Sequence, residues 1–192
     1  MIRTNPELAT YIQSLWALEG SQILKENFGP KEVIIEQDRR YGKVHLIREG
    51  IAKCYISDEN GKEFIQEFLG EGMEFGELEV FDNHTTICSV ESITALKTYA
   101  LPHSAYHTLL DTDPKFNRLI MKALANKIRF KAPRHSYQHS YPIEDNLIRL
   151  KQLFPEFTKV ISKKDIANYI GITPRSLNRA LKELKEKSDF FN

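Results

Sequence analysis

Three cationic side chains near the end of the chain are spaced so that they share one face of a helix. Arg175, Arg179 and Lys182 stand four and three residues apart, and residues at those spacings are neighbours on a helix surface. Arginine suits a two-pronged contact with guanine in the major groove, and lysine suits a phosphate. The pattern predicts a helix that binds duplex DNA. The side chains expected at the DNA are Thr173, Arg175, Ser176, Asn178, Arg179 and Lys182, with Lys163 and Lys164 near the phosphate backbone.

The surrounding residues have the pattern of a helix-turn-helix. Ser162 is suited to begin a first helix, because its side chain can accept a hydrogen bond from a free backbone N–H. Ala167 and Gly171 provide the small contact and the tolerance of positive φ that a tight turn needs. Thr173 followed by Pro174 begins a second helix in the same way. The apolar side of that helix is expected at Leu177, Ala180, Leu181 and Leu184.

Charge is distributed unevenly along the chain. Residues 113–192 contain 17 Lys and Arg against 8 Asp and Glu, a net +9, whereas residues 1–112 contain 10 against 18, a net −8. Phosphates would repel an acidic surface, so a polyanionic partner is expected only for the C-terminal part. The alternative for the motif is an ordinary helical hairpin whose outward cations are merely hydrated.

The composition is that of an ordinary soluble protein, with 41% hydrophobic and 28% charged residues among 192. No apolar run is long enough to cross a bilayer and the N-terminus lacks a signal-peptide core, so the cytoplasm is the expected location. Only Cys54 and Cys88 occur, too few for a four-thiolate cluster. They are expected to be small buried hydrophobes, with a single disulfide or a reactive thiol as alternatives. We expect neither a metal nor a cofactor.

Short β-rich runs separated by turn signals occupy residues 31–102, after a helix expected over residues 5–19. Asn60-Gly61 is the clearest hairpin turn. Many short strands at close spacing are typical of an antiparallel barrel or jelly-roll. The expected strands are Val33–Ile35, Val44–Ile47, Ile51–Ile56, Phe64–Leu69 and one or more within Ile87–Leu101.

A helix with one apolar face follows, begun by Asp113-Pro114 and expected to end or kink at Pro133. Its apolar stripe has two interpretations: it packs against the β-rich domain of its own chain, or it pairs with a second subunit. For the second interpretation the dimerisation residues are Phe116, Leu119, Ile120, Ala123, Leu124 and Ile128.

The predicted fold class is therefore α+β, in three parts. Residues 1–112 form an N-terminal helix and an antiparallel β-roll, residues 113–140 a connecting helix, and residues 141–192 a helix-turn-helix domain.

This order of elements resembles the Crp/Fnr family of bacterial transcription regulators over nearly the whole chain. Phe75-Gly76-Glu77-Leu78 looks like the start of that family's phosphate-binding cassette, and Tyr141-Pro142-Ile143 looks like its hinge. The resemblance implies a homodimer that places two recognition helices in successive major grooves of a near-palindromic operator, with RNA polymerase among its candidate partners.

The effector site departs from the family pattern. The resemblance points to Gly76, Glu77, Leu78, Thr85 and Thr86 as effector contacts. Family members that bind cyclic AMP hold its phosphate with an arginine, and the matching residues here, 84–88, read His-Thr-Thr-Ile-Cys. Glu79 would also add negative charge beside the phosphate, and a buried anion without a cation is costly. Cyclic AMP is therefore not expected, and the identity of any effector is left open. Gly76 and Glu77 also have a structural interpretation, in which the glycine permits a sharp turn and the carboxylate accepts backbone N–H bonds.

The C-terminus is a second departure, because the sequence ends at Asn192 where family members continue into a β-hairpin wing that touches the phosphate backbone. The wing is expected to be either naturally absent or truncated. Its loss would remove phosphate contacts.

Two other functions compete with DNA binding. One is a metal-dependent enzyme of cupin type, whose metal site needs two histidines one residue apart. No such pair occurs around His45 or His84. His103 and His107 are expected on a solvated face outside the roll. We therefore predict that the protein is not an enzyme. The other is a ligand sensor that acts through a protein partner without binding DNA.

Overall fold

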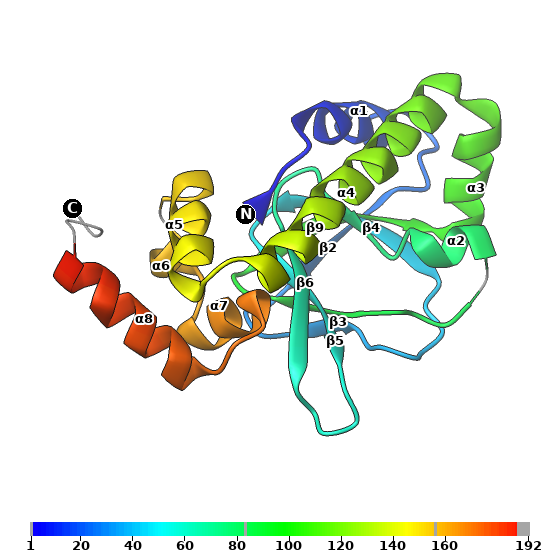
Figure 1. Cartoon of the computed structure of the whole chain (residues 1–192). Coiled ribbons are helices and arrows are strands. Elements are labelled where there is room, and N and C mark those ends of the chain that lie inside the picture. The colour runs from blue at the N-terminus through cyan, green and yellow to red at the C-terminus, as the bar shows by residue number, and fades with distance from the viewer. Residues whose placement is uncertain (1, 83, 156, 188–192) are drawn as a thin grey trace.

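The computed structural model describes residues 2–82, 84–155 and 157–187, apart from the side chains of residues 82, 135–140, 153 and 185–187. Figure 1 shows a β-roll with α4 crossing it and α5 to α8 gathered at one end. The fold class is confirmed as α+β, with the roll before the C-terminal helices. No helix in the described ranges has the length and apolar character to cross a membrane.

The roll consists of two packed sheets. The five-stranded sheet has the order β1-β6-β5-β8-β3 and the four-stranded sheet has the order β2-β9-β4-β7, with antiparallel pairs except for β1 beside β6. The expected strands are present, and the Asn60-Gly61 turn joins β5 to β6. The strands are β1 (Ile2–Arg3), β2 (Leu24–Phe28), β3 (Val33–Ile35), β4 (Lys43–Glu49), β5 (Ala52–Ser57), β6 (Glu63–Leu69), β7 (Glu74–Phe75), β8 (Ser89–Ser92) and β9 (Leu96–Pro102).

Helices α1 (Pro6–Trp16), α3 (His103–Thr112) and α4 (Pro114–Ser140) pack against the roll. Asn5 begins α1 by accepting the N–H of Leu8. Val44 and Leu101 from the four-stranded sheet share a core with the apolar side of α4. A second core lies between the two sheets and includes Ile35, Ile47, Leu69, Val90 and Leu96.

The C-terminal helices are α5 (Ile143–Leu153), α6 (Phe157–Val160), α7 (Lys163–Ile170) and α8 (Pro174–Lys187). As expected, Ser162 caps α7 by accepting the N–H of Asp165, and Gly171 ends α7 at φ +82°. The apolar side of α8 is buried at Leu177, Ala180, Leu181 and Leu184. The expected helix-turn-helix is therefore present as α7 and α8. The expectation about a wing concerns the C-terminal residues 188–192, which lie outside the described residues.

The helix was expected to end or kink at Pro133, and it does not end there, because α4 continues through Pro133 to Ser140. A proline inside a helix costs about 3 kcal/mol or more. Arg134, the next residue, donates hydrogen bonds to carbonyls of β6 and α7. These tertiary contacts offset the local cost, and no local pattern indicates them.

His45 is completely buried in β4 and is structural. One ring nitrogen lies 2.6 Å from the Tyr41 hydroxyl and the other 3.1 Å from the hydroxyl of Thr98. Burial lowers the pKa of His45 to about 4, so the ring is neutral near pH 7. Both ring nitrogens are satisfied within the fold.

Candidate nucleic-acid interface and roll cavity

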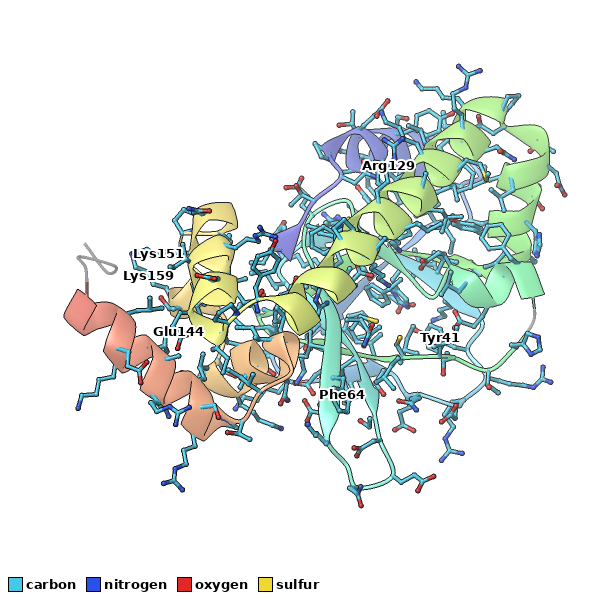
Figure 2. All side chains as sticks on the ribbon, in the orientation of Figure 1. Tyr41, Phe64, Arg129, Glu144, Lys151 and Lys159 are labelled. Atoms are coloured by element: carbon cyan, nitrogen blue, oxygen red, sulfur yellow. The ribbon has the colours of Figure 1, made fainter. Side chains whose placement is uncertain are left out.

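The predicted DNA-binding face of α8 is turned to solvent. Arg175, Asn178, Arg179 and Lys182 are exposed on α8, and the side chain of Arg179 is 75% exposed. Nitrogen-tipped side chains extend from the outer side of α8, away from the rest of the molecule (Figure 2). The buried leucine stripe explains this orientation, because a helix that buries one side presents the other.

The start of α8 is held by a local hydrogen bond. The Thr173 hydroxyl accepts the N–H of Ser176 at 3.1 Å, and the two hydroxyls lie 3.0 Å apart. Thr173 is exposed and Ser176 is half-buried. These two predicted contact residues therefore also cap the helix that carries the cations.

The two lysines predicted near the DNA backbone have different surroundings. Lys163 and Lys164 are both exposed at the N-terminus of α7. The Lys164 ammonium lies 2.8 Å from a carboxylate oxygen of Glu63 on β6, and the Asn168 amide donates to the other oxygen at 3.4 Å. Lys164, predicted near the phosphate backbone, thus pairs with a carboxylate of its own chain.

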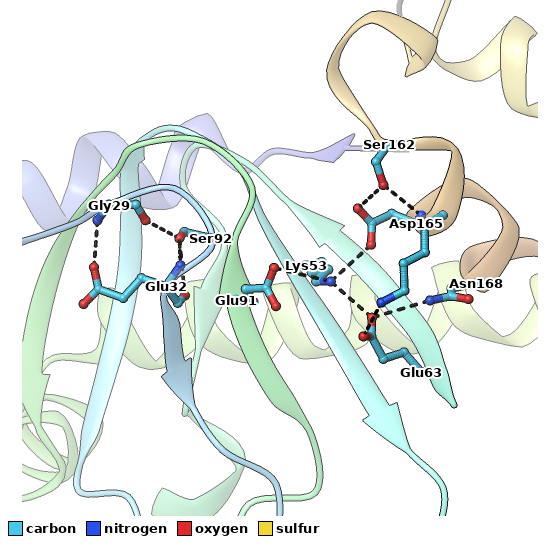
Figure 3. A network of polar contacts seen from close by, with 10 residues as sticks. Gly29, Glu32, Lys53, Glu63, Glu91, Ser92, Ser162, Asp165 and Asn168 are labelled. Atoms are coloured by element: carbon cyan, nitrogen blue, oxygen red, sulfur yellow. Dashed lines mark hydrogen bonds and ion pairs between the residues drawn. The ribbon is translucent and has the colours of Figure 1, made fainter. Parts of the chain in front are cut away.

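A buried lysine that no local sequence pattern indicates joins the roll to α7. The Lys53 ammonium lies 3.2 Å from Glu63, 3.4 Å from Glu91 and 3.1 Å from Asp165. Figure 3 shows these carboxylates converging on it from β6, β8 and the start of α7. Burial opposes the charge of Lys53, but the carboxylates of Asp165, Glu91 and Glu63 outweigh burial and raise its pKa. We call Lys53, Glu63, Glu91 and Asp165 the Lys53 cluster.

Arg134 at the end of α4 makes a second connection between the roll and α7. Its guanidinium donates to the carbonyl of Ile65 at 2.7 Å and to that of Tyr169 at 2.6 Å. The same guanidinium lies 3.7 Å from the centre of the Tyr169 ring. Ile65 and Phe68 of β6 also belong to the apolar core that contains the helix-turn-helix leucines. The helix-turn-helix is therefore packed on its own roll.

The predicted effector residues Glu77 and Leu78 line a cavity of about 60 Å³ between the roll and α4. Lys127 projects from α4 into its wall, with its ammonium 2.6 Å from Glu77 and 3.3 Å from Glu74. The same ammonium donates to the backbone carbonyl of Glu74 at 2.9 Å. Burial opposes the charge of Lys127, but the carboxylates of Glu74 and Glu77 outweigh it and raise the pKa of Lys127. The Glu77 carboxylate thus binds a lysine of its own chain.

The remaining predicted effector residues, Gly76, Thr85 and Thr86, have different surroundings. Gly76 has φ +81°, and a Cβ there would lie 2.5 Å from the carbonyl oxygen of Lys43, which confirms the structural interpretation of the glycine. The buried Thr86 hydroxyl donates to the carbonyls of Glu36 and Arg39, so its single donor is used within the roll. Thr85 and Leu78 are exposed.

Most of the predicted dimerisation residues are buried within the chain itself. Phe116, Leu119, Ile120 and Ala123 are at most 7% exposed and belong to a core shared with the roll. Their prediction as subunit contacts is corrected, because side chains already packed inside a fold are not available to a second subunit. Leu124 is partly buried against the same core, and Ile128 is 70% exposed.

The residues considered for an enzyme are used structurally. The ring of His103 lies 3.3 Å from the carbonyl oxygen of Gly76, and that of His107 lies 2.7 Å from the carbonyl oxygen of Val80. His107 is exposed and His103 half-buried, as expected of a solvated face, and both rings also contact backbone carbonyls beside the cavity. Among the described residues, no group of three or more His, Cys, Asp or Glu could hold a metal ion.

Comparisons with known proteins agree with this organisation. Residues 25–113 match the family model of the cyclic nucleotide-binding domain. The cAMP-activated global transcriptional regulator CRP of Salmonella typhimurium is 21% identical over an alignment of 184 residues that covers 90% of this chain and 87% of CRP. The c-di-GMP responsive global regulator CLP of Xanthomonas campestris has a similar structure, with a TM-score of 0.79 at 12% identity over 95% of this chain and 93% of CLP. A CRP/FNR family transcriptional regulator of Thermus thermophilus has a TM-score of 0.71 at 16% identity, over 86% of this chain and 87% of its own.

Proposed function

Because the chain is a Crp/Fnr-type transcription regulator, we propose that it binds a specific DNA site as a homodimer and that it does so without cyclic AMP. The observation that carries the DNA-binding proposal is the exposed cationic face of α8, with Arg175 and Arg179 turned away from a buried leucine stripe. In this proposal the two arginines contact base edges, and Lys163 lies close to the phosphate backbone.

Arg179→Ala is expected to weaken binding to the preferred site by about 1–3 kcal/mol and to relax one base preference. Site selection from a random duplex library, followed by gel shift at several salt concentrations, measures both effects. Arg40→Ala, which removes an exposed arginine of the roll, should change neither. An unaltered site preference after Arg179→Ala would remove the assigned role, and salt-independent binding would count against phosphate contacts.

The homodimer proposal is supported by the outer side of α4. Met121 and Ile128 are 60% and 70% exposed there. They stand seven residues apart, the spacing of a coiled-coil seam. In this proposal α4 buries one side against its own roll and offers Met121 and Ile128 to the α4 helix of a second copy.

Ile128→Glu is expected to raise the dimer dissociation constant at least about a hundredfold, because burying an uncompensated carboxylate costs several kcal/mol. Sedimentation equilibrium measures this constant. Leu18→Glu is the control, since Leu18 is also an exposed apolar residue, 62% exposed, but lies beyond the end of α1. A dimer of unchanged affinity in Ile128→Glu would place the subunit interface elsewhere.

Independence from cyclic AMP is supported by the cavity. Its volume of about 60 Å³ is well below the roughly 300 Å³ at which small-molecule pockets begin. Lys127 in the cavity wall already pairs with Glu77. The small volume and this internal ion pair argue against a cyclic nucleotide in this cavity. Calorimetric titration of the full chain with cyclic AMP should give no binding heat, and a saturable isotherm would overturn this part of the proposal.

A further inference from the structure

The two cysteines of the chain are brought together in the roll. Cys54 lies on β5 opposite Val90 of β8, and Cys88 stands two residues before Val90. Cys88 lies in the bend just before β8 (Ser89–Ser92). Both cysteines line the cavity between the roll and α4, although 34 positions separate them in the sequence.

We propose that Cys54 and Cys88 form a reversible disulfide when the protein meets a hydroperoxide, and that this cavity is therefore a redox-modification site. A hydroperoxide is then the signal of the proposed regulator. Only this regulatory meaning rests on the proposed function. Both side chains face the same cavity, and forming the disulfide requires the two sulfurs to close to the roughly 2 Å of an S–S bond.

The surroundings give the two sulfurs different roles. Interaction with the Cys54 thiol, together with the charge of Lys131, holds the pKa of Cys88 below its usual range. The same interaction and burial raise the pKa of Cys54. Cys88 is only half-buried, whereas Cys54 is buried. Since the thiolate is the reactive form, Cys88 is the attacking sulfur and Cys54 the resolving one.

The reaction balances with one hydroperoxide. The Cys88 sulfur attacks the peroxide oxygen, an S–O bond forms, the O–O bond breaks, and an alcohol or water leaves with one proton. The Cys54 sulfur then attacks the Cys88 sulfenic acid, the S–S bond forms, and the S–O bond breaks with release of water. The two sulfurs lose two electrons, and the peroxide gains them.

The position of the pair gives oxidation a route to α4. Cys54 lies opposite Glu67 of β6 in the sheet. The Glu67 carboxylate forms ion pairs with the Lys131 ammonium of α4 at 3.1 Å and with the Arg3 guanidinium at 2.8 Å. A disulfide that moves β5 towards Cys88 therefore changes the surroundings of the Glu67–Lys131 ion pair, which joins β6 to α4.

The test treats the purified full chain with hydrogen peroxide, blocks free thiols, and measures intact mass and peptide masses. We expect the loss of two hydrogens, a cross-linked pair of peptides containing Cys54 and Cys88, and full reversal by dithiothreitol. In Cys54→Ser, dimedone should trap a sulfenic acid at Cys88. In Cys88→Ser, Cys54 should stay unmodified over the same time.

Three outcomes would overturn the inference: no cross-link in the wild-type protein, a disulfide only between two copies of the chain, or equal peroxide reactivity of Cys54 in Cys88→Ser. Circular dichroism of both variants checks that they fold, and alanine replaces serine if either does not. Arg179→Ala should form the disulfide like the wild type. The chemical result is thus independent of whether DNA binding is demonstrated.

Discussion

Lys53→Met is expected to lower the free energy of unfolding by about 3–5 kcal/mol, because it removes the buried cation shared by the buried Asp165 and the half-buried Glu63 and Glu91. Glu63, Glu91 and Asp165 all lie within 3.4 Å of the Lys53 ammonium. Without it, Glu63 and Asp165 repel each other across the contact between the roll and α7. The destabilisation should therefore be concentrated at this contact.

Urea unfolding measures the total loss of stability, and hydrogen exchange locates it. Amide protons of α7 should exchange faster in Lys53→Met, while those at the start of α4 keep their wild-type rates. Lys97→Met is the control, since Lys97 pairs with Glu49 on the surface and both are largely exposed. If Lys53→Met unfolds at the wild-type urea concentration, the Lys53 cluster does not hold the helix-turn-helix on the roll.

Lys127→Met is expected to have a comparable effect, a loss of about 3–5 kcal/mol, because it leaves the Glu77 carboxylate buried without its cation. Glu74 contributes less to the loss, since burial raises the pKa of its carboxyl and favours the neutral form. Thermal and urea unfolding of the purified variant provide the measurement. Lys122→Met on the same helix is the control, because its pair with Glu7 is exposed.

A double variant separates the charge effect from lost packing. Adding Glu77→Gln to Lys127→Met removes the carboxylate that the first change leaves unpaired, so part of the lost stability should return. If the double variant is no more stable than Lys127→Met alone, the unpaired Glu77 carboxylate does not account for the loss. The cycle also measures how strongly α4 is joined to the Gly76–Leu78 segment.

Two buried lysines, Lys53 and Lys127, connect helices of this chain to the β-roll. Lys127 joins α4 to the cavity wall through Glu77, and Lys53 joins α7 to the roll through Asp165. Both ammonium groups are buried, where an ion pair is screened much less than at the surface. Movement of either helix would separate charges in a poorly solvated place. The orientation of α8 therefore depends on the contacts of the roll with α4 and α7.

Local patterns were sufficient for the helix-turn-helix and for most strands of the roll, whereas β2 and α3 lay outside the predicted elements. The helix-turn-helix could be predicted because its signals lie within a few residues of each other: the cap at Ser162, the turn at Gly171 and the leucine stripe of α8. The outward cations followed from the same stripe, since burying one side of a helix determines the other. The strands and their main hairpin were likewise indicated by alternation and by Asn60-Gly61.

The pairing of distant residues was decided only by the tertiary structure. Nothing near Lys53 in the sequence indicates Asp165, which lies 112 positions away, and nothing near Lys127 indicates Glu77. The stripe of α4 showed that Phe116 and Ile120 would be buried, but not against which surface. Spacing along a helix specifies a face, whereas the partner of that face depends on how the whole chain packs. For the same reason the sequence contained both cysteines, and only the fold placed them in one cavity.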